Sequence, residues 1–185
     1  GLAGWLVERF QIPLLCSGTT YLMSRNIALD PNSLDADFYR DFYLRHGMDP
    51  DTVALVVTQG HAYLGMVDSL PLSFRRCVAG DQLRFGERTF DVIDGNGHAA
   101  EQLMLYCKAE RILLAADQVM ARITPNVSVS AIDPEGDPLG LYLRSLTELA
   151  DQIDPEALVL AGHQLPFVGL QTRCRQIADH HAARC

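Results

Sequence analysis

Three side chains of metal-binding type each follow an apolar run that is closed by small residues. TFDVIDGNG leads to His98, RILLAA leads to Asp117, and ALVLAG leads to His163. Imidazole and carboxylate groups bind divalent zinc and leave coordination positions open for water, as a hydrolytic metal site requires. A strand end anchored in a core holds such a group rigidly, and small residues let the backbone turn tightly beside it. The repetition favours a metal site built from these three residues.

Each of the three signals also has an ordinary structural explanation. A histidine after a strand more often makes a structural hydrogen bond than binds a metal, and an aspartate there is a common helix cap or turn residue. The remaining histidines carry weaker signals. His46 and His61 are isolated, and we expect each to lie on the surface or in the core. A solvated helix face explains the pair His180 and His181.

The elements that position the three residues are strands that alternate with amphipathic helices. DQLRF and RTFDVI flank Gly86 and Glu87, a two-residue connection typical of a type II′ hairpin. RILLAA, NVSVSAI and ALVLAG are expected to form further strands. A layered α/β fold in one domain, residues 1–185, accommodates this order.

Two helices are predicted in the second half of the chain. DPLGLYLRSLTELADQI has its apolar residues at helical spacing, and LQTRCRQIADHHAARC forms a closing helix. The expected apolar face of the first of these helices consists of Leu139, Leu143, Leu146 and Ala150.

The first third of the chain is mainly helical by pattern. LAGWLVERF predicts a helix and IPLLCS a short strand, and DADFYRDFYLRHG predicts a helix that runs from an Asp cap to a Gly stop. We expect residues 19–70 to form a helical cover region. Its larger side chains either shape a site for an apolar acyl or aromatic substrate or form core: Tyr21, Met23, Phe38, Tyr39, Phe42 and Tyr43.

Composition limits the function classes. The chain has 185 residues, of which 48% are apolar, and a formal charge of -8, so it can bury a core and is a poor partner for nucleic acid. No apolar stretch approaches the ~18 residues of a membrane span, and the N-terminus lacks a signal-peptide pattern. We therefore expect a soluble, cytoplasmic protein with no membrane partner. Its 5 cysteines include no C-x-x-C pair, which favours reduced structural thiols.

Three longer segments carry a resemblance to a known family. They are GHAAEQLMLYCKAERILLAADQVMARITPNVSV, DPLGLYLRSL and AGHQLPFVGLQTRCRQIADHHAAR, and they contain G-H-x-x-E, A-D-Q and G-H-x-x-P-F in that order. The chain resembles the C-terminal half of metallo-β-lactamase superfamily hydrolases of the glyoxalase-II-like kind. The resemblance implies an αββα sandwich with a centre of two divalent metal ions, usually zinc and sometimes iron or manganese.

The resemblance also implies roles for the three residues. His98 would bind the first ion, His163 the second, and Asp117 would bridge both. A metal-bound hydroxide would attack an ester, thioester or lactone carbonyl of a small acyl substrate, and no catalytic residue beyond the ligands is needed. The substrate-binding residues are unknown from the sequence.

One motif of the family is missing from the chain. H-x-H-x-D-H, which supplies most of the remaining ligands, does not occur, and the chain begins with GLAGWL, which resembles the segment after that motif in the family. We therefore expect an incomplete domain, mainly the C-terminal half with a helical insertion, which carries only part of the metal site and by itself binds metal weakly and hydrolyses poorly. Its exposed apolar surface allows self-association.

Two other functions remain open at this point. The first alternative is a non-catalytic binding or scaffold module that keeps the fold without a complete metal site. The second is a nucleotide-binding α/β domain, which the absence of G-x-G-x-x-G and G-x-x-x-x-G-K-[ST] disfavours.

Overall fold

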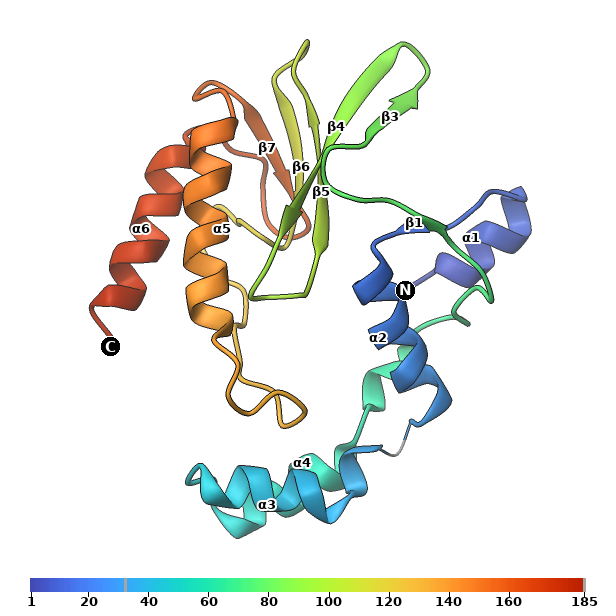
Figure 1. Cartoon of the computed structure of the whole chain (residues 1–185), viewed down its shortest axis with the longest axis vertical. Coiled ribbons are helices and arrows are strands. Elements are labelled where there is room, and N and C mark those ends of the chain that lie inside the picture. Colours follow the sequence, from blue (N-terminus) through green and yellow to red (C-terminus); the bar gives the residue numbers. More distant parts are fainter. Residues whose placement is uncertain (32, 185) are drawn as a thin grey trace. The chain divides into compact units, whose positions relative to one another are not determined.

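The computed structural model describes residues 1–31 and 33–184, without the side chains of residues 35 and 63, and divides into two compact units (Figure 1). The first unit comprises residues 1–76 and 129–136, and the second comprises residues 77–128 and 137–185. The single domain over residues 1–185 stays a prediction, and so does the covering role of residues 19–70.

The second unit is built on a mixed sheet of five strands in sequence order. They are β3 (Gln82–Phe85), β4 (Arg88–Gly95), β5 (Gln102–Cys107), β6 (Ile112–Ala116) and β7 (Leu158–Ala161). The pairs from β3 to β6 are antiparallel, and β6 and β7 are parallel. The predicted hairpin is confirmed, because Phe85 pairs with Arg88. Gly86 has φ +62° and Glu87 has no positive φ, as a type II′ turn requires.

Two helices cover one face of this sheet: α5 (Pro138–Gln152) and α6 (Leu170–Ala182) (Figure 1). Asp137 begins α5, because its carboxylate accepts the Gly140 N–H at 2.7 Å and Pro138 fits the first helical position. The sheet and the helices enclose the core of the unit. Its fully buried members include Leu113, Ala115, Val119, Tyr142, Ala157, Val159, Leu170 and Ile177. The predicted mixed α/β fold is confirmed.

The buried face of α5 differs from the predicted one. Its buried residues are Tyr142, Ser145, Leu146 and Leu149, so only Leu146 of the expected face is fully enclosed. Tyr142 and Ser145 look polar in the pattern but find hydrogen-bond partners inside the unit: the Tyr142 hydroxyl donates to the Gln118 carbonyl at 3.0 Å, and the Ser145 hydroxyl accepts the Asn96 N–H at 3.1 Å. A core tolerates a buried hydroxyl that has a hydrogen-bond partner. The buried side of α5 therefore includes Tyr142 and Ser145 and differs from the side predicted by apolar residues alone.

The strand expected at NVSVSAI is wrong. The alternation of Val127 and Val129 suggested a half-buried strand, yet the segment joins no ladder and ends in an isolated bridge between Ser130 and Asp133. The carbonyl of Asn126 faces a side chain, His98, instead of a neighbouring strand. Alternating side chains form a strand only where another strand edge meets the backbone.

The first unit is mostly helical, as predicted. Its elements are α1 (Ala3–Phe10), β1 (Leu15–Cys16), α2 (Gly18–Leu29), η1 (Ser33–Asp35), α3 (Asp37–Arg45), α4 (Pro50–Gln59), η2 (Ala62–Met66) and β2 (Arg75–Arg76). The strands β1 and β2 pair in parallel. Ser17 and Asp49 cap α2 and α4 by accepting the N–H groups of Thr20 and Thr52.

The helix α3 begins later than the sequence suggested. Its N-cap is Ala36, so the predicted Asp cap is wrong, and it ends just before His46 and Gly47, which has φ +86°. The expected glycine stop is thereby confirmed.

The cysteines agree with the free thiols expected from the sequence. Among the described cysteines no disulfide forms, and Cys77, Cys107 and Cys174 are buried. Cys185 lies outside the described residues. None of the described helices combines the length and the apolar character that crossing a membrane requires.

Candidate metal centre

The topology of the second unit brings three strand ends to one edge of the sheet. Because β4 and β6 are both antiparallel to β5, they run in the same direction, and β7 is parallel to β6. The carboxyl ends of β4, β6 and β7 therefore share an edge. His98 follows β4 after Asn96 and Gly97, Asp117 follows β6 directly, and His163 follows β7 after Gly162.

At this edge the Asp117 carboxylate lies near both imidazoles. Nε2 of His98 is 3.8 Å from Asp117 Oδ2, and Nε2 of His163 is 3.6 Å from Asp117 Oδ1. Each imidazole thus faces a different oxygen of one carboxylate. The His163 side chain is 67% exposed, whereas those of His98 and Asp117 are only about a third exposed. The structure therefore brings together all three residues singled out in the sequence.

A backbone carbonyl fixes the tautomer of His98. Nδ1 lies 2.8 Å from the carbonyl oxygen of Asn126, which can only accept, so Nδ1 carries the proton and donates it. In the neutral ring this leaves the lone pair of Nε2 toward Asp117. A lone pair and a carboxylate oxygen repel each other unless a water, a proton or a cation lies between them, and a divalent ion would satisfy both. Metal-binding histidines usually have this support on their other nitrogen.

The separations suit donors that share an ion, but the donor set is partial. Two donors that each lie about 2.1 Å from one ion are about 3.4 Å apart at a tetrahedral angle. However, among the described residues no group of three or more His, Cys, Asp or Glu side chains could hold one metal ion. The three residues therefore fit two positions that share Asp117, each with one imidazole and one carboxylate oxygen.

Comparison with solved structures places this unit and the rest of the chain in a family. A β-lactamase domain protein from Burkholderia ambifaria is 33% identical, with a TM-score of 0.78, over 100% of this chain and 51% of its own. A metallo-β-lactamase family protein from Thermus thermophilus is 26% identical, with a TM-score of 0.78, over 100% of this chain and 57% of its own. The chain belongs to the metallo-β-lactamase superfamily.

The chain spans about half the length of these two metallo-β-lactamase relatives. A metallo-β-lactamase from Pontibacter korlensis is 15% identical, with a TM-score of 0.57, over 95% of this chain and 60% of its own, and it shares the fold. No family model and no curated protein matches the sequence.

In this member of the metallo-β-lactamase superfamily, unusual backbone geometry surrounds Asp117. Ala116 has φ +45°, and the register between β6 and β7 shifts between Leu114 and Ala116. An L-residue in the left-handed region costs about 1 to 2 kcal/mol, so neighbouring contacts must hold it. The Gly162 N–H donates to the Ala116 carbonyl at 2.6 Å, and a Cβ at residue 162 would overlap Asp117 Oδ1. A side chain at residue 162 would therefore push the Asp117 carboxylate from its present position.

Residues that the sequence did not single out support the loops of the site. Gln118 is fully buried, and its amide donates to the Asn96 carbonyl at 3.2 Å. Gln164, which has φ +70°, accepts the Arg122 N–H at 2.9 Å through its side-chain oxygen. A glutamine that follows a strand does not identify a supporting residue in a single sequence, because the residue that it bonds lies far away along the chain.

The other histidines have structural contacts. His46 is exposed, and its ring lies 4.5 Å from that of Phe42. His61 Nε2 is 3.0 Å from the Ser33 hydroxyl. His180 is exposed on α6, as expected of a solvated face. His181 is half-buried beside Tyr142, and burial lowers the pKa of its imidazole.

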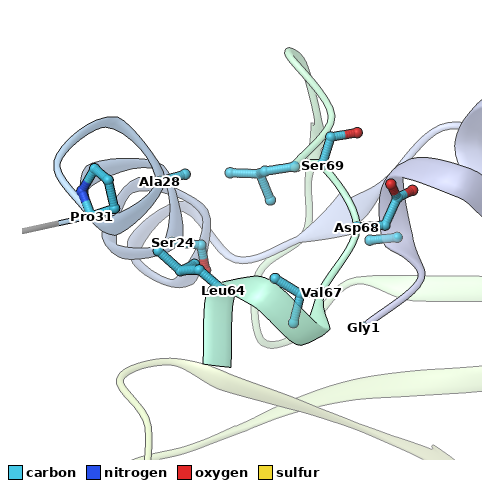
Figure 2. A pocket seen from close by; sticks show the side chains of 10 residues that line it. Gly1, Ser24, Ala28, Pro31, Leu64, Val67, Asp68 and Ser69 are labelled. Carbon is cyan, nitrogen blue, oxygen red and sulfur yellow. The ribbon is translucent and has the colours of Figure 1, made fainter. Parts of the chain in front are cut away.

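The first unit contains an apolar cavity of about 490 Å³. Ser24, Ala28, Leu64 and Val67 contribute to its wall, with Asp68 at its edge (Figure 2). None of the six large side chains proposed for a substrate site lines this cavity. Two of them, Tyr21 and Phe42, are buried as packing residues, while Met23 and Phe38 are about half exposed.

Proposed function

We propose that this metallo-β-lactamase superfamily protein is a metal-dependent hydrolase, with His98, Asp117 and His163 as ligands of two divalent ions. The observation that carries the proposal is the Asp117 carboxylate, which has one imidazole Nε2 facing each of its oxygens at 3.8 and 3.6 Å. Members of the superfamily are usually hydrolases, which supports the reaction class.

Each residue has a distinct role in the proposed site. His98 presents Nε2 because Nδ1 donates to the Asn126 carbonyl, so its ring orientation is set before an ion arrives. Asp117 would supply negative charge to both positions and would be shared by the two ions. His163, on the more exposed side, completes the second position. When bound, two divalent ions supply Lewis acidity and an activated water for attack on an ester, thioester or lactone carbonyl.

Zinc is the proposed metal, because imidazole and carboxylate are its usual ligands in hydrolytic sites. Iron is a second candidate. A protein solved in a di-iron-bound form is 20% identical, with a TM-score of 0.57, over 94% of this chain and 69% of its own. Manganese is the third ion to test.

Metal binding by the 185-residue chain tests the ligand assignment directly. Metal-free protein is titrated calorimetrically with Zn²⁺, Fe²⁺ or Mn²⁺, the Fe²⁺ under nitrogen, and bound metal is counted by mass spectrometry after dialysis. Asp117→Ala should weaken both positions, whereas His98→Ala and His163→Ala should each weaken one. His46→Ala is the matched control, because this exposed imidazole lies at the end of α3. Equal binding by the wild type and the Asp117 variant would refute the assignment.

Hydrolysis is tested on small acyl substrates. An ester, a thioester and a lactone are each incubated with metal-loaded protein, with and without a chelator. Turnover that the chelator abolishes and added metal restores is the expected result. Turnover that is insensitive to the chelator would contradict metal-dependent catalysis by this chain.

A non-catalytic binding module is the second candidate. The observation that favours it is the partial donor set, because each proposed position has two protein donors and structural or catalytic zinc normally has three or four. A protein that binds no metal, and whose partner binding is unchanged in the His98 and Asp117 variants, would support this candidate over the hydrolase.

A further inference from the structure

The turn that carries Asp117 is held by a side chain from a different strand. Gln102 is the first residue of β5 and pairs with Gly95, the last residue of β4. With its amide oriented so that the oxygen faces the turn, that oxygen accepts the backbone N–H of Asp117 at 2.9 Å and of Gln118 at 3.1 Å. One acceptor therefore ties down two successive peptide groups beyond the end of β6.

This turn needs such support because the regular ladder has ended. The left-handed Ala116 and the register shift turn the chain out of the sheet at this point. An N–H group that has left the ladder requires another acceptor, or it costs about 1 to 3 kcal/mol when it is buried. Gln102 supplies that acceptor from the middle of the same sheet.

Other contacts hold the turn from its remaining sides. The Tyr142 hydroxyl donates to the Gln118 carbonyl, the Gln118 amide donates to the Asn96 carbonyl, and the Gly162 N–H donates to the Ala116 carbonyl. Those contacts bind Ala116 and Gln118, the two neighbours of Asp117. The Gln102 oxygen is the acceptor that binds the peptide N–H of Asp117 itself.

We propose that Gln102 is a positioning residue for the metal centre, because its amide oxygen fixes the backbone of Asp117 so that the carboxylate lies between His98 and His163. This inference rests on the proposed function, since it assigns Gln102 a role through a proposed metal ligand. Gln102 is not one of the proposed ligands and would act only through the backbone of Asp117. Groups of this kind typically contribute 10- to 100-fold to metal affinity (~1 to 2 orders of magnitude).

Two variants of Gln102 separate the acceptor from the volume of the side chain. Gln102→Met keeps the length but removes the acceptor oxygen, and Gln102→Glu keeps an oxygen that can accept both N–H groups. Gln171→Met is the matched control, because the Gln171 amide also makes two bonds to backbone, with the carbonyls of Ala150 and Ile153 at 3.1 and 2.8 Å. The control removes two bonds in which the side chain is the donor, between α6 and the end of α5, away from the turn.

The first measurement uses metal-free protein and does not depend on the proposed function. Amide hydrogen exchange of Asp117 should be slow in the wild type and in Gln102→Glu and faster in Gln102→Met, whereas that of Gln118, whose N–H also donates to the Ala115 carbonyl at 3.1 Å, should change less. Unchanged exchange in Gln102→Met would overturn the proposal, because the turn would then be held without the Gln102 oxygen.

The second measurement is Zn²⁺ affinity by calorimetry. Gln102→Met should bind Zn²⁺ about tenfold or more weakly, with Gln102→Glu restoring most of the affinity and Gln171→Met close to wild type. Equal loss in Gln102→Met and Gln171→Met would reduce Gln102 to a general contributor to stability and overturn the positioning role. Wild-type affinity in Gln102→Met would overturn the positioning role alone. Absence of Zn²⁺ binding by the wild type would instead overturn the proposed function, and the positioning role with it.

Discussion

The two units of the chain differ in how they treat their apolar side chains. The second unit encloses its own core between the sheet and the helices α5 and α6. The first unit buries a few residues, such as Phe42 and Val53, and leaves large apolar side chains exposed, including Met66 at 77% and Leu72 at 84%. A rigid core is what fixes ligand geometry, and the three candidate ligands all follow strands of the second unit.

The exposed apolar residues of the first unit extend over α1, where Trp5 and Phe10 are each about half exposed and their rings meet edge to face. Exposed apolar surface of this kind commonly marks an interaction site. The candidate centre and the candidate interaction surface therefore belong to different units. Substitutions near the candidate ligands of the second unit should therefore change metal binding, and substitutions on the exposed surface of the first unit should not.

The largest effect is expected from removal of Asp117, the carboxylate proposed to serve both metal positions. Asp117→Ala should lower chelator-sensitive turnover by on the order of 100-fold or more, because both metal positions lose a donor. Asp68→Ala is the control from the first unit, since Asp68 is an exposed carboxylate at the edge of its cavity. Turnover of an ester or thioester is the measurement. A comparable loss in the Asp68 variant would assign part of the reaction to the first unit, and the separation of roles between the two units would then be wrong.

A core truncation compares the two units by stability. Leu113 is fully buried in the second unit, whereas Leu55 is 57% exposed on α4. Leu113→Ala should lower the free energy of unfolding by about 3 kcal/mol, through lost burial and a residual cavity. Leu55→Ala should change it by about 0.5 kcal/mol or less.

Urea denaturation followed by circular dichroism measures both values. A similar loss in the two variants would mean that Leu55 is covered in solution, for example by self-association of the first unit. Repeating the titration at several protein concentrations separates that case, because burial by self-association makes the midpoint concentration-dependent.

The sequence predicted the strand ends of the second unit because the signals there are local. Each signal lies within a few positions: an apolar run, a small residue and then His98, Asp117 or His163. The sheet topology then brings the three strand ends to one edge. By contrast, the supports of the site come from far along the chain. Gln102 is 15 residues from its partner Asp117. Tyr142 is 24 residues from its partner Gln118.

The same distinction explains the errors. Tyr142 and Ser145 are absent from the predicted apolar face of α5 because a pattern records residue type and omits the partner that satisfies a buried hydroxyl. NVSVSAI alternates like a strand but meets no strand edge. For the first unit, helices could be predicted from spacing, whereas the burial of Tyr21 and the exposure of Phe38 depend on packing that spacing does not reveal.

A pair of glycine substitutions gives an intermediate effect and again contrasts the two units. Gly162→Ala places a Cβ against Asp117 Oδ1, so we expect a loss of about 1 to 3 kcal/mol in stability and a weaker affinity for Zn²⁺. Gly65→Ala in η2 meets no atom within 4 Å, so it should be neutral or slightly stabilising. Thermal denaturation and zinc calorimetry of both variants check this. Unchanged zinc affinity in Gly162→Ala would show that the Asp117 carboxylate is free to move away.

The smallest effect concerns thiol chemistry and compares Cys16 of the first unit with Cys174 of the second. Burial raises the pKa of the Cys174 thiol to about 12, and it raises the pKa of the half-buried Cys16 thiol above its usual range. The thiolate is the reactive form, so at pH 8 iodoacetamide should modify Cys16 first and Cys174 only when the second unit opens. Peptide mapping by mass spectrometry resolves the two sites.

The raised pKa of Cys174 also gives the stability of the second unit a pH dependence. Because this pKa is higher in the folded state than in the unfolded state, folding retains a proton that the unfolded chain loses, and this contribution to stability disappears as the pH rises from about 9 to about 12.

Labelling of Cys174 as fast as Cys16 at pH 8 would mean that the second unit opens as readily as the first. The contrast between a second unit with an enclosed core and a first unit with exposed apolar side chains would then not extend to their opening.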